Sequence, residues 1–202
     1  MNTPEQKFYK YVILVDIAFV TEAATGLRGF MSRQLGRELP PFDLVGWLGY
    51  LSMDGGIEPK ADHEIQVIFV SDHEKKALTG CLPAQLEALQ GQACRTEWGE
   101  FLFSVVTPAD ITDSAHLFMD LTHIILDARE VERLLIVPCD RIYGGELNSD
   151  LTKFFKEKEG VSDKKLLRFA MSQPGEPSMG YPYDFVGYSI LQALGVKPDE
   201  LQ

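Results

Sequence analysis

Residues 107–155 read TPADITDSAHLFMDLTHIILDAREVERLLIVPCDRIYGGELNSDLTKFF. This stretch predicts a helix that begins at Asp113 or Ser114 and is apolar over most of its circumference, as a helix packed against a sheet is. A buried strand over 133–139 follows and ends in Pro-Cys-Asp. A helix followed by a buried strand is typical of an open α/β sheet, whose chemistry gathers at the carboxyl ends of the strands. Asp140 stands at that position.

One polar stripe runs along the predicted helix. His116, Asp120, His123 and Asp127 follow one another at i, i+4, i+7 and i+11, so they share one face. The stripe is either the solvent-facing edge of an amphipathic helix or a set of groups in which Asp120 faces a cleft. A histidine and a carboxylate four residues apart can bind a divalent ion. No Cys or His pair with a familiar ligand spacing accompanies them.

The remaining strands and helices alternate along the chain. Strands are expected over 11–20, 64–71 and 100–107, with an edge strand over 165–171, and helices over 21–35, 42–53, within 74–90 and over 148–157. This order predicts a three-layer α/β fold with a mostly parallel central sheet of about five strands flanked by helices. With 202 residues, 45% of them hydrophobic, the chain forms one predicted domain, with a core over about 11–171 and a C-terminal loop and helix over 172–202.

Composition narrows the class of function. The formal net charge of −11 disfavours a general nucleic-acid-coating role. Three scattered cysteines favour a reducing, cytoplasmic location, and the apolar run over 11–20 is too short to span a membrane. No glycine-rich phosphate loop is present, so no nucleotide cofactor is expected, and the GxSxG elbow of serine hydrolases is missing too. Cys139 is either a nucleophile or, as is more usual, a small buried residue.

Asp16 is an acid inside the first apolar run. An unpaired buried carboxylate is costly, so Asp16 is either a functional acid or the N-cap of the following helix. The functional acid is the favoured interpretation.

The C-terminal segment 182–188, PYDFVGY, echoes residues 41–47, PFDLVGW. Each copy is expected to start an Asp-capped helix. The two helices either pack together and form a surface for homo-oligomerisation through Trp47, Tyr50 and Tyr188, or they are independent helix starts with core aromatics. The Pro- and Gly-rich segment 172–182 before the second copy is a loop, either a lid over the strand ends or a rigid connection.

Three acidic segments resemble a known family. VILVDIAF (12–19), SAHLFMDL (114–121) and LLIVPCDRIY (134–143) together resemble the PIN-like nucleases, and the NYN branch most closely. The resemblance implies a parallel α/β fold in which carboxylates converge at the strand ends and hold Mg²⁺ or Mn²⁺, which activates water to attack an RNA phosphodiester. It places Asp16, Asp120 and Asp140 in metal-binding, catalytic roles.

The sequence departs from the NYN pattern at three places. Ile142 stands where a second acid is usual, residues 17–19 lack the usual Asn, and residues 110–113 replace a Lys-Gly pair. Glu146, Asp113 or Asp150 could supply the lost acid.

Two hypotheses follow. The favoured one is a non-catalytic PIN-like module that acts through protein association. The alternative is a metal-dependent ribonuclease or phosphodiesterase that uses Asp16, Asp120 and Asp140, with His116 or Glu146 as an auxiliary group and RNA as its partner. Neither hypothesis involves a membrane.

Overall fold

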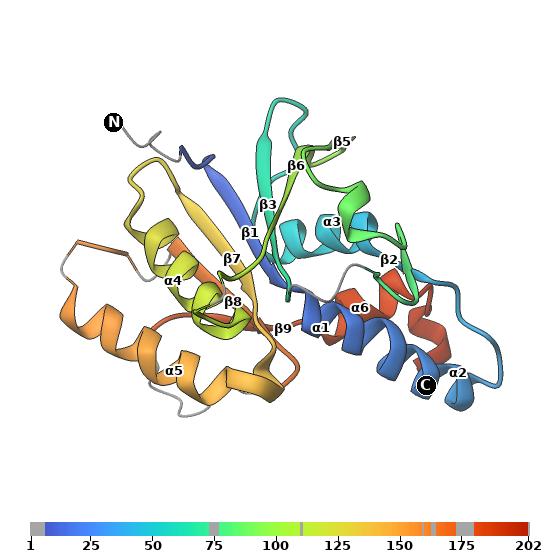
Figure 1. Cartoon of the computed structure of the whole chain (residues 1–202). Coiled ribbons are helices and arrows are strands. Elements are labelled where there is room, and N and C mark those ends of the chain that lie inside the picture. The colour runs from blue at the N-terminus through green and yellow to red at the C-terminus, as the bar shows by residue number, and fades with distance from the viewer. Residues whose placement is uncertain are drawn as a thin grey trace.

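A seven-stranded sheet runs through the computed structural model in the order β5-β6-β3-β1-β7-β8-β9 (Figure 1). The structure describes residues 7–72, 77–109, 111–158, 160–162, 165–172 and 180–201. Six strands are parallel, and β5 pairs antiparallel with β6. Their bounds are β1 Tyr11–Asp16, β3 Glu64–Val70, β5 Ala93–Thr96, β6 Gly99–Val106, β7 Arg133–Val137, β8 Leu166–Ala170 and β9 Tyr183–Phe185. The predicted α/β fold with a mostly parallel central sheet is confirmed.

The strand order reverses direction between β1 and β7. The chain adds β3 and β6 on one side of β1 and then returns to place β7, β8 and β9 on the other side. Tyr11 therefore lies opposite Ile65 of β3 and opposite Arg133 of β7. In open α/β sheets, such a reversal opens a crevice outside the carboxyl ends of the two strands, where ligands bind.

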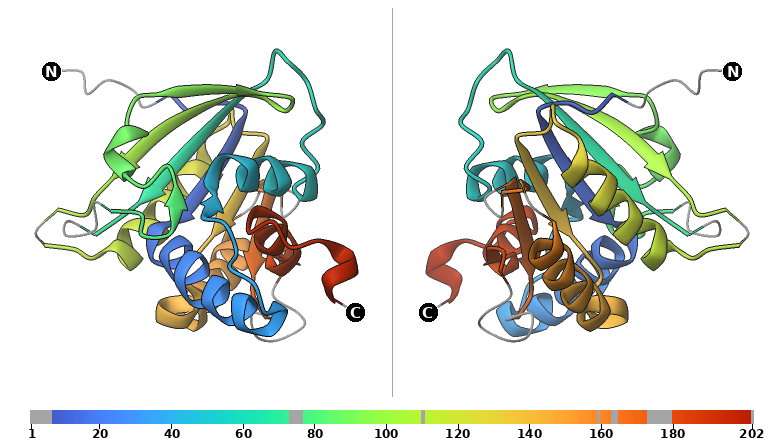
Figure 2. Two further views of the ribbon diagram at one scale, coloured as in Figure 1. Left: turned by 90° about the vertical axis from the view of Figure 1, so that its right-hand side faces the viewer. Right: turned by 90° about the vertical axis from the view of Figure 1, so that its left-hand side faces the viewer.

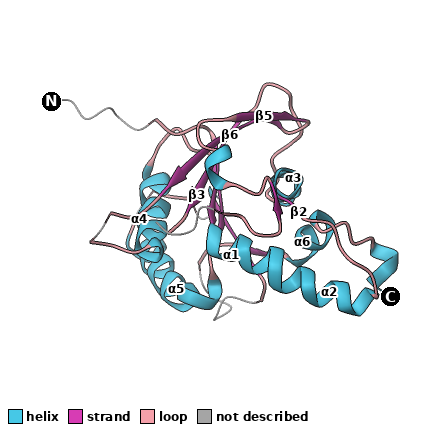
Figure 3. Ribbon diagram, turned by 45° about the vertical axis from the view of Figure 1, so that its right-hand side comes forward, coloured by secondary structure: helices cyan, strands magenta, loops and turns pink. Residues whose placement is uncertain are grey.

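Helices cover both faces of the sheet (Figures 2 and 3). One face carries α4 (Ser114–Asp127) and α5 (Asp140–Glu157), and the other carries α3 (Leu44–Asp54) with α6 (Gly187–Ala193) packed on it. Residues 12–15 of β1 and 134–137 of β7 are fully buried. Burial on both faces explains why these strands read as continuous apolar runs.

A long helical segment starts directly after β1. It is made of α1 (Ile17–Glu22), the π-helical segment η1 (Ala23–Leu27) and α2 (Arg28–Leu35), and it ends at Gly36, whose φ of 63° suits a helix C-terminus. Asp16 Oδ1 accepts a hydrogen bond of 2.7 Å from the Ala18 amide and so caps the helix. The first strand therefore ends at Asp16 rather than at residue 20.

Two more predicted elements begin or pair differently from expectation. α5 begins at Asp140, not at Asn148, and Tyr143 interrupts its helical geometry with a φ of −137°. β8 is not an edge strand, because β9 pairs with it on its outer side.

The segment between β3 and β6 is the least regular part of the fold. Instead of an α-helix, the described residues of 74–90 contain β4 (Cys81–Leu82), which pairs with β2 (Phe42–Asp43), and the 3₁₀ turn η2 (Leu86–Ala88). A second 3₁₀ turn, η4 (Pro198–Leu201), follows α6 near the C-terminus. No helix in the described ranges is long and apolar enough to cross a membrane.

The two similar helix starts differ in the structure. α3 and α6 do pack together, as one interpretation predicted, and Asp43 caps α3 by accepting from the Gly46 amide at 3.0 Å. Asp184, however, lies in β9, and α6 begins after Val186.

Trp47 does not belong to an association surface. It is fully buried, and its Nε1 donates to Ser189 Oγ at 3.2 Å. Tyr50 is half-buried, and Tyr188 is 75% exposed. The prediction that Trp47 forms an interaction surface with Tyr50 and Tyr188 is therefore wrong for Trp47, because α6 covers the indole. The lid interpretation of 172–182 concerns 173–179, which lie outside the described residues.

Candidate functional site

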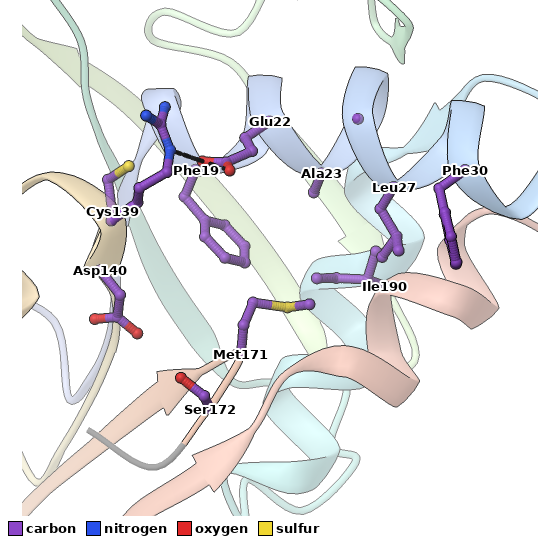
Figure 4. Close-up of a pocket in the computed structure, with 12 residues that line it drawn as sticks. Phe19, Glu22, Ala23, Leu27, Phe30, Cys139, Asp140, Met171, Ser172 and Ile190 are labelled. Atoms are coloured by element: carbon purple, nitrogen blue, oxygen red, sulfur yellow. Dashed lines mark hydrogen bonds and ion pairs between the residues drawn. The ribbon is translucent and has the colours of Figure 1, made fainter. Parts of the chain in front are cut away.

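A cleft of about 510 Å³ opens at the switch point of the sheet, at the carboxyl ends of β7 and β8 and beside α1, which leaves β1 (Figure 4). Its walls are mainly apolar side chains from the segment 17–35, from the residue after β8 and from α6. They are Phe19, Ala23, Leu27, Phe30, Met171 and Ile190. Phe30 and Met171 are about half exposed, at 50% and 49%. The cleft therefore presents a largely apolar surface to solvent.

Polar groups stand at the other end of the cleft. Asp140 and Arg141 begin α5, and Ser172 follows β8. Arg141 Nε donates to both carboxylate oxygens of Glu22 at 3.1 Å, which joins α5 to α1 (Figure 4). Both side chains are exposed, so this ion pair contributes little to stability.

Asp140 is held by a buried arginine. Arg168 of β8 is 1% exposed, and its Nη2 donates to Asp140 Oδ1 at 2.6 Å and to the Gly144 carbonyl at 3.1 Å. Gly144 permits this approach, because a Cβ there would lie 3.1 Å from Asp140 Oδ1. Arginine is protonated at every relevant pH, and a buried charge must be paired. Asp140 is its counter-ion.

The far side of Arg168 is tied to a second polar chain. Its Nη1 donates to the Tyr181 hydroxyl at 2.9 Å, and that hydroxyl donates to Asn148 Oδ1 at 2.9 Å. Burial raises the pKa of Tyr181, so the phenol stays protonated and can donate. Arg168 Nε has no hydrogen-bond partner within the described residues.

Asp16, at the end of β1, is also engaged by the protein. It is 2% exposed, and besides capping α1 it accepts from the Tyr143 hydroxyl at 2.8 Å. Burial and the Asp16 charge raise the pKa of Tyr143, which keeps the phenol a donor. The same hydroxyl accepts from the Cys139 amide at 3.4 Å and so links the ends of β1 and β7.

Cys139 is suited to packing rather than to attack. Burial, with a contribution from the Asp16 charge, raises the pKa of its thiol to about 11, and the residue is 1% exposed. Because the thiolate is the nucleophile, a thiol with this pKa is inert at neutral pH. All three cysteines are free.

The three acids of the predicted metal site do not converge. Asp16 and Asp140 lie at the ends of the adjacent strands β1 and β7, but Asp120 is exposed on α4. Asp120 lines a second groove of about 500 Å³ between α4 and α5, together with His116, His123 and Glu146. The polar stripe of α4 faces α5 rather than the sheet edge. In the parts of the chain that the structure describes, no three His, Cys, Asp or Glu residues are grouped to hold a metal.

The histidines of the second groove are already paired with acids. His123 Nε2 lies 2.8 Å from Asp150 Oδ2, and the imidazole stacks on Phe154 at a centroid distance of 4.8 Å. His116 Nδ1 lies 2.8 Å from Asp113 Oδ1, and this hydrogen bond raises the pKa of His116. These contacts place His116 at the N-terminal cap of α4 and His123 between α4 and α5.

Three polar residues near the cleft escaped sequence reasoning: Arg168, Tyr143 and Tyr181. The available signal was Arg168 itself, a permanent charge inside the apolar run KLLRFAM over 165–171.

Comparison with known proteins gives a family without an assigned role. No curated protein and no solved structure matches the chain significantly. The model of a "Family of unknown function (DUF6621)" matches residues 5–201. Because this match spans almost the whole sequence, the chain belongs to the DUF6621 family.

Proposed function

We propose that this chain is a non-catalytic α/β binding module whose site is the apolar cleft at the switch point. One observation carries the proposal. Both carboxylates at this edge of the sheet, Asp16 and Asp140, are engaged by protein groups, whereas the apolar walls beside them are open.

Metal chemistry is poorly supported at this edge. Mg²⁺ and Mn²⁺ need several oxygen ligands in a regular arrangement. Both oxygens of Asp16 accept hydrogen bonds from the protein, and Asp140 is paired with a guanidinium. With Arg168 on Oδ1, Asp140 has only its second oxygen left for a metal ion. Among the residues that the structure describes, the ribonuclease alternative therefore has no assembled ligand set in its favour.

Binding is supported by the position and chemistry of the cleft. Ligand sites in α/β proteins lie at switch points, and they are typically apolar cavities of this size with a few fixed polar groups. A ligand that covers the exposed halves of Phe30 and Met171 would gain about 1 kcal/mol of binding free energy from each side chain.

A PIN-like origin and a cytoplasmic location are part of the same proposal. The positions of Asp16 and Asp140, at the ends of adjacent parallel strands, support that origin. Tyr143 and Arg168 then occupy places where a metal ion would otherwise satisfy the two acids.

The cleft is tested with a neutral apolar probe, N-phenylnaphthylamine, whose fluorescence rises on transfer from water. Gly26 lines the cleft, and a Cβ there would meet nothing within 4 Å. Gly26→Leu should therefore place a side chain in the cleft without a clash at its Cβ, and leucine favours the helix over glycine. Gly145→Leu is the matched control, because Gly145 also has open space and does not line the cleft.

We expect the probe to bind the wild type and Gly145→Leu equally, and to bind Gly26→Leu at least about tenfold more weakly, a loss of about 1.4 kcal/mol. Unchanged binding to Gly26→Leu would show that the probe binds outside the cleft. Failure of the probe to bind the wild type would refute the proposal. Single-stranded RNA incubated with Mn²⁺ should stay intact. Cleavage that disappears in Asp16→Asn would establish the nuclease instead.

A further inference from the structure

We propose that the cleft selects ligands whose apolar body carries an ammonium group, and that Asp140 binds this group. The inference rests on the proposed function and adds the chemical class of the ligand.

The carboxylate of Asp140 is a fixed hydrogen-bond acceptor, and the described residues use only one of its two oxygens. Arg168 holds Oδ1, while Oδ2 has no hydrogen-bond partner among the described residues. The Asp140 side chain is 26% exposed and lines the cleft. In Figure 4 the carboxylate stands at one end of the cleft, with Phe19 and Met171 toward the middle and Phe30 at the other end. An apolar ligand lying along the cleft would bring one end to Asp140.

The arginine behind Asp140 makes the acceptor a charged one. Because Arg168 is buried and permanently protonated, the pair requires Asp140 to be ionised. Hydrogen bonds to an ionised acceptor are roughly twice as strong as neutral ones, and an N⁺–H donor gains most. The guanidinium also restrains the rotation of the carboxylate, so little side-chain freedom is lost on binding.

The charged groups that a ligand can reach in the cleft favour a cation over an anion. Glu22 and Asp140 are the two acids of the lining, and Arg141 is its one base among the described residues. Arg168 balances the charge of Asp140, but it is 1% exposed and does not line the cleft, so the carboxylate is the group that a ligand meets. The Arg141 guanidinium is paired with Glu22 through its Nε, which reduces its attraction for a ligand carboxylate or phosphate. The net charge of −11 also attracts cationic ligands to the protein over longer distances.

The aromatic walls suit the same ligand. Phe19 and Phe30 both line the cleft away from Asp140 (Figure 4), so the apolar body of a ligand can bury against them while its ammonium group reaches the acid. An apolar amine is therefore complementary to the walls and to the acid.

The test compares three ligands with one apolar body and different heads: phenylbutylamine, phenylbutanol and phenylbutyrate. Each displaces N-phenylnaphthylamine from the wild type at neutral pH. We expect the amine to bind about tenfold more tightly than the alcohol, and the carboxylate to bind more weakly than the alcohol.

Asp140→Asn should reduce the advantage of the amine to less than about threefold and leave alcohol binding unchanged. Glu146→Gln removes one negative charge from the same helix but from the other groove, so the preference should persist. If Asp140→Asn fails to fold, the affinities of the wild type for the amine and the alcohol decide whether the cleft prefers an ammonium group. Equal binding of amine and alcohol overturns the inference while the proposed function stands, and failure of all three ligands and the probe overturns both.

Discussion

The ion pair between Asp140 and Arg168 can be tested by a double-mutant cycle made of Asp140→Ala, Arg168→Met and the double variant. The two residues differ in their surroundings. Arg168 is 1% exposed and has no other carboxylate among the described residues, whereas the Asp140 side chain is 26% exposed. Removing Asp140 therefore leaves the buried charge of Arg168 without a carboxylate partner and out of reach of water. Removing Arg168 leaves the charge of Asp140, which water can still solvate.

The expected free energies follow from this asymmetry. Removing one partner of a buried pair costs about 3–5 kcal/mol. We expect about 3 kcal/mol for Asp140→Ala, because Arg168 keeps its bonds to Tyr181 and Gly144. Arg168→Met should lower the free energy of unfolding by about 2 kcal/mol. This variant loses the hydrogen bonds to Tyr181 and Gly144, but water can solvate the Asp140 carboxylate. The double variant should lose about 3 kcal/mol rather than the sum of about 5, which gives a coupling energy of about 2 kcal/mol.

Urea unfolding monitored by tryptophan fluorescence and by circular dichroism measures these values. With a slope of about 2 kcal/mol per molar urea, Asp140→Ala should lower the midpoint by about 1.5 M. Coincident transitions from the two signals establish that one free energy describes unfolding. Additive effects of the single substitutions would refute the pairing. The charge assigned to Asp140 in the cleft would then lose its basis.

Three further outcomes are expected. Tyr143→Phe removes the hydroxyl that donates to buried Asp16 and should lower the unfolding free energy by about 1.5–3 kcal/mol, measured by urea titration; a smaller change would show that the bond is dispensable. The hydrogen bond from Arg37 lowers the pKa of Glu200 from 4.5 to about 2, so the stability due to this pair is present above pH 4.5 and is lost as the pH falls through about 2. The Glu200 carboxyl chemical shift should titrate near pH 2 in the wild type and at a higher pH in Arg37→Met, where the Lys197 amide still donates to Glu200; equal midpoints would exclude the pair in solution. Cys139 should react with iodoacetamide far more slowly in the folded than in the urea-unfolded protein, as mass spectrometry of its peptide would show, and equal rates would contradict its burial.

The parallel sheet could be predicted because its central strands are buried on both faces. The apolar runs over 11–16, 64–70 and 133–137 carry few polar residues, and helix caps such as Asp43 and Asp113 mark the boundaries between elements. The sequence does not predict β5, because its residues, ACRT, alternate between exposed and half-buried positions at the edge of the sheet and carry no apolar signal.

Other failures arose where tertiary packing decides. The sequence predicts a strand that continues past Asp16 because residues 17–20 are as apolar as the strand itself. The chain turns into a helix there, and the same side chain that looked catalytic caps it. Trp47 looked available for association, yet only the position of Ser189, more than a hundred residues away, shows that its indole is covered.

Arg168 marks the limit of sequence reasoning at the cleft. A guanidinium inside an apolar strand indicates that a carboxylate must lie nearby, because the unpaired charge could not be buried. The sequence offers 30 acids and does not say which one. The structure selects Asp140, and this choice changes the chemistry of the site. An acid that seemed free to hold a metal is instead half of an ion pair, with one oxygen directed by the protein and one left for a ligand. This pairing is the reason for proposing a binding role for these residues rather than hydrolysis.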